Sequence, residues 1–245
     1  MSESRPVLQR PGGELASRPL HFFWVVDVSG SMFGDKIATV NNAIQETVPM
    51  MQDAADENPN AQFLVRTLKF GTGAQWVTAS PVPVADFAWE DLTSGGVTDM
   101  GKAFEMLSAQ LSIPPMSDRA LPPVIVLLTD GQPTDDYKKG LEKLMKQPWG
   151  KKAVRVAISI GQDADDDVLI DFTGNRELVL QANNAPDLVK MIKWASTLAS
   201  MTSAPASRPD IVKDPESSSG DNNAPLVIDM DNIPKPEEGG AGVVW

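Results

Sequence analysis

The sequence predicts an α/β fold: a doubly wound, mostly parallel sheet with one antiparallel edge strand and helices on both faces. Residues 20–26 and 124–128 are continuous apolar runs, which are typical of strands covered on both faces of a parallel sheet. Segments with helical spacing of apolar residues alternate with strand-like runs from residue 20 to residue 199. This alternation is characteristic of a Rossmann-like sheet, whose ligand sites lie at the carboxyl ends of the strands.

The first half of the predicted domain continues from the central strand at residues 20–26. Apolar residues recur every three or four positions over 35–55, which predicts a long amphipathic helix that Pro49 kinks near its end. The strand-like runs 62–70 and 75–79 are joined by a link too short for a parallel crossover, so the second run is expected as the antiparallel edge strand. Helical spacing over 100–111 predicts the second helix.

The second half repeats the alternation after the buried strand at 124–128. Its predicted elements are a helix at 134–146, a strand at 153–160, a short helix at 165–171, a strand at 177–181 and a final helix at 186–199.

Two terminal segments flank the domain, which is expected to span residues 20–200. Residues 1–19 contain proline and glycine without a periodic pattern, which is typical of an arm. Residues 201–245 are rich in Ser, Pro and Gly and carry eight acidic against three basic side chains, so they cannot form a core of their own. Apolar islands in this tail are either docking segments for a sheet edge or groove, or incidental residues in a solvated tail. The islands are Leu226, Val227 and Ile228, and the terminal residues that end at Trp245.

Composition excludes several classes of function. The net charge of −12 argues against nucleic acid or an anionic membrane as the main partner. The absence of cysteine excludes disulfides and thiolate zinc sites, and the single histidine, His21, is expected to be structural. The first 20 residues lack the apolar stretch of a secretory signal, and no segment reaches the roughly 20 apolar residues needed to cross a bilayer, so a cytoplasmic protein is expected.

Oxygen-bearing side chains follow the predicted strands. Asp27, Ser29 and Ser31 come directly after the central strand, Thr98 lies in a Gly-Gly-Val-Thr turn, and Asp130 follows the second buried strand. The carboxyl ends of neighbouring parallel strands meet at one edge of a sheet, so these side chains are expected to surround one hard cation. Mg²⁺ suits the set, with hydroxyls as direct ligands, carboxylates acting through water, and one position open to a partner's acidic group. Mn²⁺ and Ca²⁺ take the same kind of ligand.

The five positions resemble the metal-ion-dependent adhesion site of von Willebrand factor A domains and integrin inserted domains, in order, strand context and residue identity. Within that superfamily, the Phe-Phe-Trp-Val-Val-Asp-Val-Ser-Gly-Ser-Met and Leu-Leu-Thr-Asp-Gly-Gln-Pro-Thr-Asp segments resemble the bacterial TerY-like family, which is associated with tellurium resistance and stress. This second resemblance implies an adaptor in a phosphorylation module, with a Ser/Thr kinase and a metal-dependent protein phosphatase as partners.

The expected function is therefore a metal-dependent protein-binding module that is not an enzyme. Met32 and Phe33 follow the metal loop and are the expected partner contacts, with simple packing under the loop as the alternative. One alternative is a metal-assisted phosphoester hydrolase, with water activated beside Asp130. Another is an adaptor that acts mainly through its tail, and a variant of it lets Asp229 or Asp231 occupy the open metal position in cis. The tail contacts expected for a partner are Leu226, Val227, Ile228 and Trp245.

Further acidic residues near the predicted site have competing interpretations. Asp99 and Asp135 flank site residues, and they either tune the metal or cap helix starts. The acidic run at 163–167 lacks the glycine-centred spacing of a calcium loop and is expected to be a solvated helix N-terminus.

Overall fold

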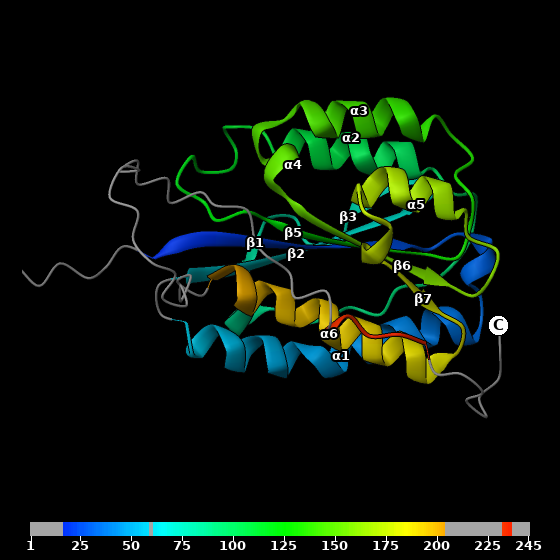
Figure 1. The fold of residues 1–245 in the computed structure, drawn as a ribbon, viewed down its shortest axis with the longest axis horizontal. Helices are drawn as coiled ribbons and strands as arrows, with labels where there is room; N and C mark the ends of the chain where they lie inside the picture. The colour runs from blue at the N-terminus through cyan, green and yellow to red at the C-terminus, as the bar shows by residue number, and fades with distance from the viewer. Residues whose placement is uncertain (1–16, 59–60, 204–231, 237–245) are drawn as a thin grey trace, which may run out of the picture.

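The computed structural model describes residues 17–58, 61–203 and 232–236, and one mixed β-sheet forms the middle layer of this described part (Figure 1). Its seven strands are β1 (Arg18–Asp27), β2 (Ala61–Gly71), β3 (Gly73–Trp76), β4 (Val82–Pro83), β5 (Val124–Thr129), β6 (Val154–Ile160) and β7 (Val179–Ala182). The order across the sheet is β3-β2-β1-β5-β6-β7, with β4 also paired to β2. The five strands from β2 to β7 in this order are parallel, whereas β3 and β4 run antiparallel to β2.

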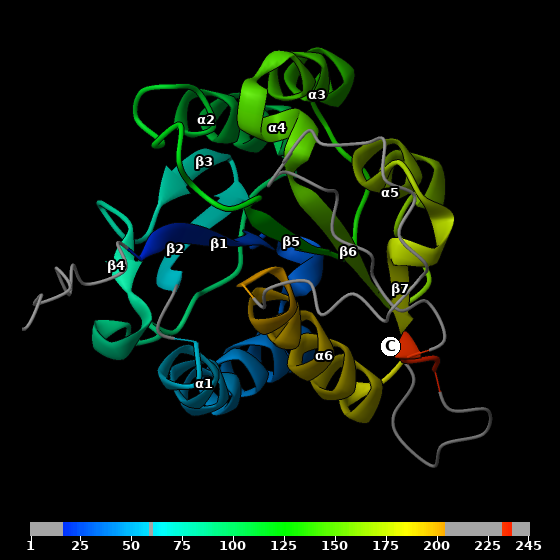
Figure 2. The same cartoon turned by 60° about the vertical axis from the view of Figure 1, so that its left-hand side comes forward.

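Helices cover both faces of the sheet (Figures 1 and 2). One face carries α1 (Asp35–Asp56) and α6 (Ala185–Ser203). The other carries α2 (Met100–Gln110), α3 (Tyr137–Lys146), α4 (Pro148–Lys152) and α5 (Asp166–Thr173). The doubly wound α/β fold expected from the sequence is therefore confirmed.

The central strand explains why its sequence is apolar without interruption. Successive side chains of a strand point to opposite faces of the sheet. Phe22 and Trp24 belong to the core cluster under α1 and α6, and Phe23 and Val25 belong to the cluster under α2, α3 and α5. All four are at most 2% exposed, and burying a side chain of this size contributes about 1.5–3 kcal/mol.

A glycine contact holds α2 against α3. A Cβ atom on Gly140 would lie 2.4 Å from the carbonyl oxygen of Gly101, and one on Gly101 would lie 2.7 Å from the carbonyl oxygen of Asp136. Real Cβ atoms do not approach backbone oxygens so closely, so the two helices can be this near only with glycine at both positions. This contact fixes the start of α2, which directly follows the Thr98 turn.

The structure shifts some predicted boundaries. The antiparallel edge strand is confirmed as β3, although it ends earlier than the predicted 75–79, and the two-residue β4 is too short to show a sequence pattern. α1 continues through Pro49 to Asp56. α3 begins at Tyr137 instead of 134, because Thr134 and Asp135 hydrogen-bond to the turn and helix around Thr98 instead of extending their own helix.

Part of the carboxyl-terminal segment lies on the domain. Ile233 packs against the core cluster under α1 and α6, and Lys190 Nζ on α6 donates to the Lys235 carbonyl oxygen at 3.3 Å. The predicted islands, Leu226 to Ile228 and the end at Trp245, lie outside the described residues, as do Asp229 and Asp231. Among the described helices, none has the length and apolar character needed to cross a membrane.

Candidate metal site at the carboxyl edge of the sheet

The two predicted carboxylates lie at the ends of adjacent strands. Asp27 is the last residue of β1, and Asp130 directly follows β5. These strands are parallel and stay in register as far as Val26 and Leu128, so both acids emerge at the same edge of the sheet. Both side chains are buried, with no exposed surface in either residue.

The loop after β1 turns back onto both carboxylates. Ser31 Oγ donates to Asp130 Oδ1 at 2.7 Å and lies 3.0 Å from Ser29 Oγ. The Ser29 amide donates to Asp27 Oδ1 at 2.7 Å, and Thr129 Oγ1 donates to Asp27 Oδ2 at 2.5 Å. Four of the five predicted ligands are thus joined through direct contacts, with Thr129 as a further hydrogen-bond donor.

Thr98 reaches the same place from a second loop. The Gly30 amide donates to the Gly96 carbonyl at 3.0 Å, which ties the Thr98 loop to the loop after β1. A Cβ atom on Gly131 would lie 3.6 Å from both Ser31 Oγ and Thr98 Oγ1, and 3.9 Å from Asp27 Oδ2. The missing side chain of Gly131 therefore leaves space beside three oxygens from two separate parts of the chain.

Burial governs the charge state of Asp27. Desolvation raises the pKa of its carboxyl, because the charged form loses contact with water. Hydrogen bonds from Thr129 and Ser29 act in the opposite direction, and the nearby charge of Asp130 adds to the increase. A cation beside Asp27 would favour its charged form.

The donors fit a hard divalent cation. All five side chains offer oxygen, two as carboxylates and three as hydroxyls, and oxygen is what Mg²⁺, Mn²⁺ and Ca²⁺ prefer. Among the described residues, no group of three or more His, Asp or Glu side chains is placed to hold a metal.

A lysine that the sequence analysis missed contacts one of the carboxylates. Lys36 Nζ lies 2.7 Å from Asp130 Oδ2, and the Lys36 side chain is only 14% exposed. Lys36 is the second residue of α1, where the helix dipole disfavours a cation. The sequence feature that could have identified Lys36 is a lysine in the first turn of the helix that follows the metal loop.

Asp135 and Asp99 shape the Thr98 loop. Asp135 accepts hydrogen bonds from the Gly101 and Lys102 amides at 2.8 and 3.0 Å, so it caps α2 from a different loop. Asp99 Oδ2 accepts from the Gly73 amide at 2.7 Å, and Asp99 Oδ1 accepts from Thr134 Oγ1 at 3.3 Å. Asp135 therefore caps a helix start, which is one of its two predicted roles. Asp99 connects its loop to the β2–β3 turn and to Thr134.

The two predicted partner contacts after the metal loop have opposite environments. Met32 has no exposed surface and packs in the core under α1, so the prediction that it contacts a partner is wrong for this structure. Its apolar side chain completes that core when the short helix Gly30–Met32 turns it inward. Phe33 is 80% exposed, and Val97, the neighbour of Thr98, is 46% exposed.

The acidic run at 163–167 and His21 both have contacts that are typical of structural residues. Asp165 accepts from the Asp167 and Val168 amides at the start of α5, so the acidic run is a capped helix N-terminus. His21 is buried in β1 and stacks on Phe23 with ring centroids 5.9 Å apart.

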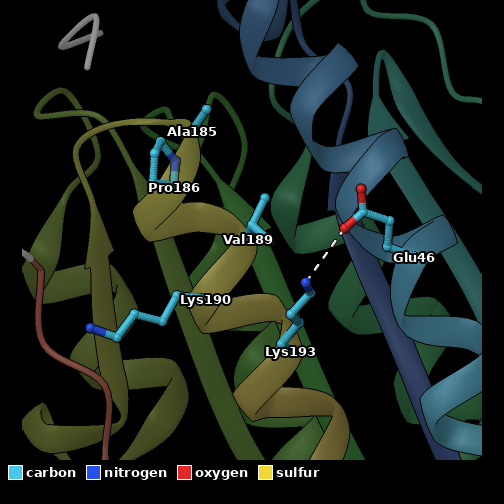
Figure 3. Close-up of a pocket in the computed structure, with 6 residues that line it drawn as sticks. All are labelled: Glu46, Ala185, Pro186, Val189, Lys190 and Lys193. Atoms are coloured by element: carbon cyan, nitrogen blue, oxygen red, sulfur yellow. Dashed lines mark ion pairs between the residues drawn. The ribbon is translucent and has the colours of Figure 1, made fainter. Parts of the chain in front are cut away.

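A groove of about 670 Å³ lies between α1 and α6 (Figure 3). Val189 and Lys193 of α6 face α1 across it, and Lys193 Nζ lies 3.5 Å from Glu46 Oε2. Lys190 points to the other side of α6, toward the segment at 232–236. None of the predicted site residues lines this groove.

An open α/β sheet with hydroxyl and carboxylate oxygens gathered beyond its central strands defines a class of domain that binds ligands through a cation. The family model of the von Willebrand factor type A domain matches residues 23–193, and this chain belongs to that family. Comparison with curated proteins gave no match.

Solved structures share the fold at low sequence identity. Proximal thread matrix protein 1 from the mussel byssus is 18% identical with a TM-score of 0.56, and the match covers 77% of this chain and 50% of that one. The ArnB paralog VWA2 from Sulfolobus acidocaldarius is 17% identical with a TM-score of 0.53, covering 74% and 45%. The pilus adhesin SpaC from Lactobacillus rhamnosus GG is 14% identical with a TM-score of 0.60, covering 76% and 31%. The match thus spans half or less of each of these proteins.

One of these neighbours has been solved with a metal. A structure of the mussel protein, again at 18% identity and a TM-score of 0.56, has a zinc-occupied metal-ion-dependent adhesion site. Domains of this family are typically metal-dependent protein interaction modules, and the donor set of this chain fits that chemistry.

Proposed function

We propose that this chain is a protein-binding module in which Asp27, Ser29, Ser31, Thr98 and Asp130 hold a divalent cation and an acidic group of the partner completes its coordination. The observation that supports this most directly is the gathering of hydroxyl and carboxylate oxygens around the space beside Gly131. Neutral hydroxyl ligands leave much of the charge of the ion uncompensated, which favours an incoming carboxylate.

Mg²⁺ is the proposed ion. The donors are all oxygen, and both carboxylates already accept hydrogen bonds from the protein, which suits a role through bridging water. Mn²⁺ and Ca²⁺ are the alternatives with the same ligand preference. The zinc in the mussel protein supports binding of a divalent ion at such a site.

A binding role is favoured over hydrolysis. Asp27 and Asp130 are both assigned to the ion in this proposal, so neither carboxylate is available as a general base. His21, the single histidine, precedes Asp27 by six residues along β1, which corresponds to about 20 Å of extended strand. We therefore propose that the protein is not an enzyme.

Two exposed apolar side chains are proposed as partner contacts. Phe33 lies two residues after Ser31, and Val97 directly precedes Thr98. The loops that carry them are joined by the hydrogen bond between Gly30 and Gly96. Phenylalanine is among the side chains enriched at protein interfaces, and Val97 extends the exposed apolar surface beside it. The partner would then present an acidic residue together with an apolar surface.

The resemblance to the TerY-like family supplies the proposed setting, a cytoplasmic stress or tellurium-resistance phosphorylation module. A Ser/Thr kinase and a metal-dependent protein phosphatase are accordingly the first partners to test. The support for this narrower proposal is the pair of sequence segments around Asp27 and Asp130.

Capture of these candidate partners tests the proposal. The immobilised chain is expected to retain the partner in Mg²⁺, and to lose it in EDTA and in the Asp27→Ala and Thr98→Ala variants. Asp53→Ala, which removes an exposed acid on α1, is the matched control and should bind as the wild type does. Retention that is equal with and without metal would refute the metal-dependent mechanism. Loss of retention only on deletion of residues 204–245 would favour the adaptor that acts through its tail.

A further inference from the structure

The contact between Lys36 and Asp130 differs from the other ion pairs of the described residues. Lys36 is 14% exposed and Asp130 is fully buried, whereas every side chain in the other described pairs is at least 31% exposed. Exposed pairs are screened by water and contribute little. A mostly buried charge keeps a much stronger influence on its neighbours. Lys36 therefore affects any charge placed at this edge of the sheet.

The charges of the site change sign when a divalent ion binds. With both carboxylates ionised, Asp27 and Asp130 contribute two negative charges and Lys36 one positive charge, which leaves a net charge of minus one. With a divalent ion bound, the same group carries plus one, and one carboxylate of a partner would neutralise it. Without the ammonium, the occupied site would already be neutral and would attract a carboxylate less.

The position of Lys36 holds its side chain at the site. The residue lies in the first turn of α1, and its ammonium donates to the Asp130 oxygen that Ser31 does not use. If Lys36 left this contact, its mostly buried ammonium would lose its charged partner, which is energetically costly.

We propose that Lys36 is a positioning residue with two opposite effects on the metal site: it weakens the binding of a divalent ion, and it strengthens the binding of an acidic group to the occupied site. This inference rests on the proposed function, because it assigns a role at the same site. It adds that the partner is selected by charge, through the one positive charge left over once the ion is bound.

Titration with Mn²⁺, followed by electron paramagnetic resonance, tests the first effect. Lys36→Met keeps an unbranched apolar side chain without the charge and should bind Mn²⁺ about tenfold more tightly than the wild type, even with water-like screening. Lys36→Arg keeps the charge and should stay close to the wild type. Lys139→Met removes an exposed charge on α3 and serves as the control for net charge.

Acetate is the probe for the second effect. Its binding to the Mn²⁺-loaded protein is read from the fall in the relaxation rate of water protons, and Lys36→Met should need about threefold more acetate than the wild type, because acetate carries half the charge of the ion. Lys36→Gln, which can still donate a hydrogen bond to Asp130, repeats both measurements should Lys36→Met fold poorly. Unchanged or weaker Mn²⁺ binding in both neutral variants, or unchanged acetate binding, would overturn the role of Lys36. Absence of Mn²⁺ binding in the wild-type protein would instead refute the proposed function itself.

Discussion

Gly131→Ala is expected to lower the metal affinity without lowering the free energy of unfolding. The backbone of Gly131 does not have the positive φ that would disfavour alanine, and the new methyl would meet its nearest atoms at 3.6 to 3.9 Å, which is ordinary van der Waals contact. An alanine that fits the native backbone raises the free energy of unfolding by up to about 1 kcal/mol, because it restricts the unfolded chain. The variant should therefore fold at least as well as the wild type.

The same methyl occupies the space that the ligands need. Its three nearest neighbours are Ser31 Oγ, Thr98 Oγ1 and Asp27 Oδ2. Disturbing groups around a metal typically lowers the affinity about 10- to 100-fold, which corresponds to about 1.4 to 2.8 kcal/mol. Affinity and stability should thus change in opposite directions.

Two measurements on the same samples check this expectation. Calorimetric titration with Mn²⁺ gives the affinity, and urea denaturation in EDTA gives the free energy of unfolding. Gly95→Ala is the matched control, since Gly95 also lies in a site loop without positive φ, and no heavy atom lies within 4 Å of its Cβ position. Wild-type Mn²⁺ affinity in Gly131→Ala would refute the assignment of this space to the ion. A large loss of stability would refute the steric argument.

The remaining predictions concern the partner surface and the core. Phe33→Ala should weaken partner binding by about 2 kcal/mol with unchanged unfolding in urea, because the side chain is 80% exposed. Burial lowers the pKa of His21 to about 4, so His21 stabilises the fold above pH 6.5 and this contribution is lost as the pH falls toward 4. From pH 7.5 to pH 5 the wild type should lose about 2 kcal/mol more than His21→Leu in urea denaturation. Gly140→Ala should destabilise the protein by about 1–3 kcal/mol or more, because the methyl collides with the Gly101 carbonyl.

Each of these three predictions can be contradicted by a specific result. Unchanged partner affinity in Phe33→Ala would exclude that side chain from the interface. Equal pH dependence of the wild type and His21→Leu would show that His21 is accessible to protons in the native state. For Gly140→Ala, the neighbouring exposed Lys139→Ala is the control, and equal stability of the two variants would contradict the close approach of α2 and α3.

Local patterns predicted most of the fold. The run at residues 20–26 is apolar on both faces because two layers of helices cover β1. An uninterrupted apolar run of this kind predicts a strand that is buried on both faces. The short link after β2 allowed only an antiparallel neighbour, and β3 is that neighbour. The start of α3 was placed too early, because the hydrogen bonds of Thr134 and Asp135 to the Thr98 region depend on residues more than 30 positions away.

The positions of the two carboxylates could be predicted from the ends of the strands. The contacts around them could not be predicted from the sequence. Asp27 and Asp130 follow apolar strands, so neighbouring parallel strands suffice to bring them together. No periodic pattern marks Thr129 as the donor to Asp27, and none marks Met32 as a core residue instead of a partner contact. Those outcomes depend on which way each side chain turns once the loop has closed.

The sequence by itself determined the parallel sheet, the edge at which ligands bind, and the oxygen chemistry of the site, because strand burial and residue type are local properties. The tertiary structure decided what surrounds that site. The ammonium of Lys36 on Asp130 and the open space beside Gly131 exist only because α1, β1 and β5 meet at one edge. Charge and free volume are set by atoms distant in sequence, and these two quantities control how tightly an ion and its acidic partner can bind.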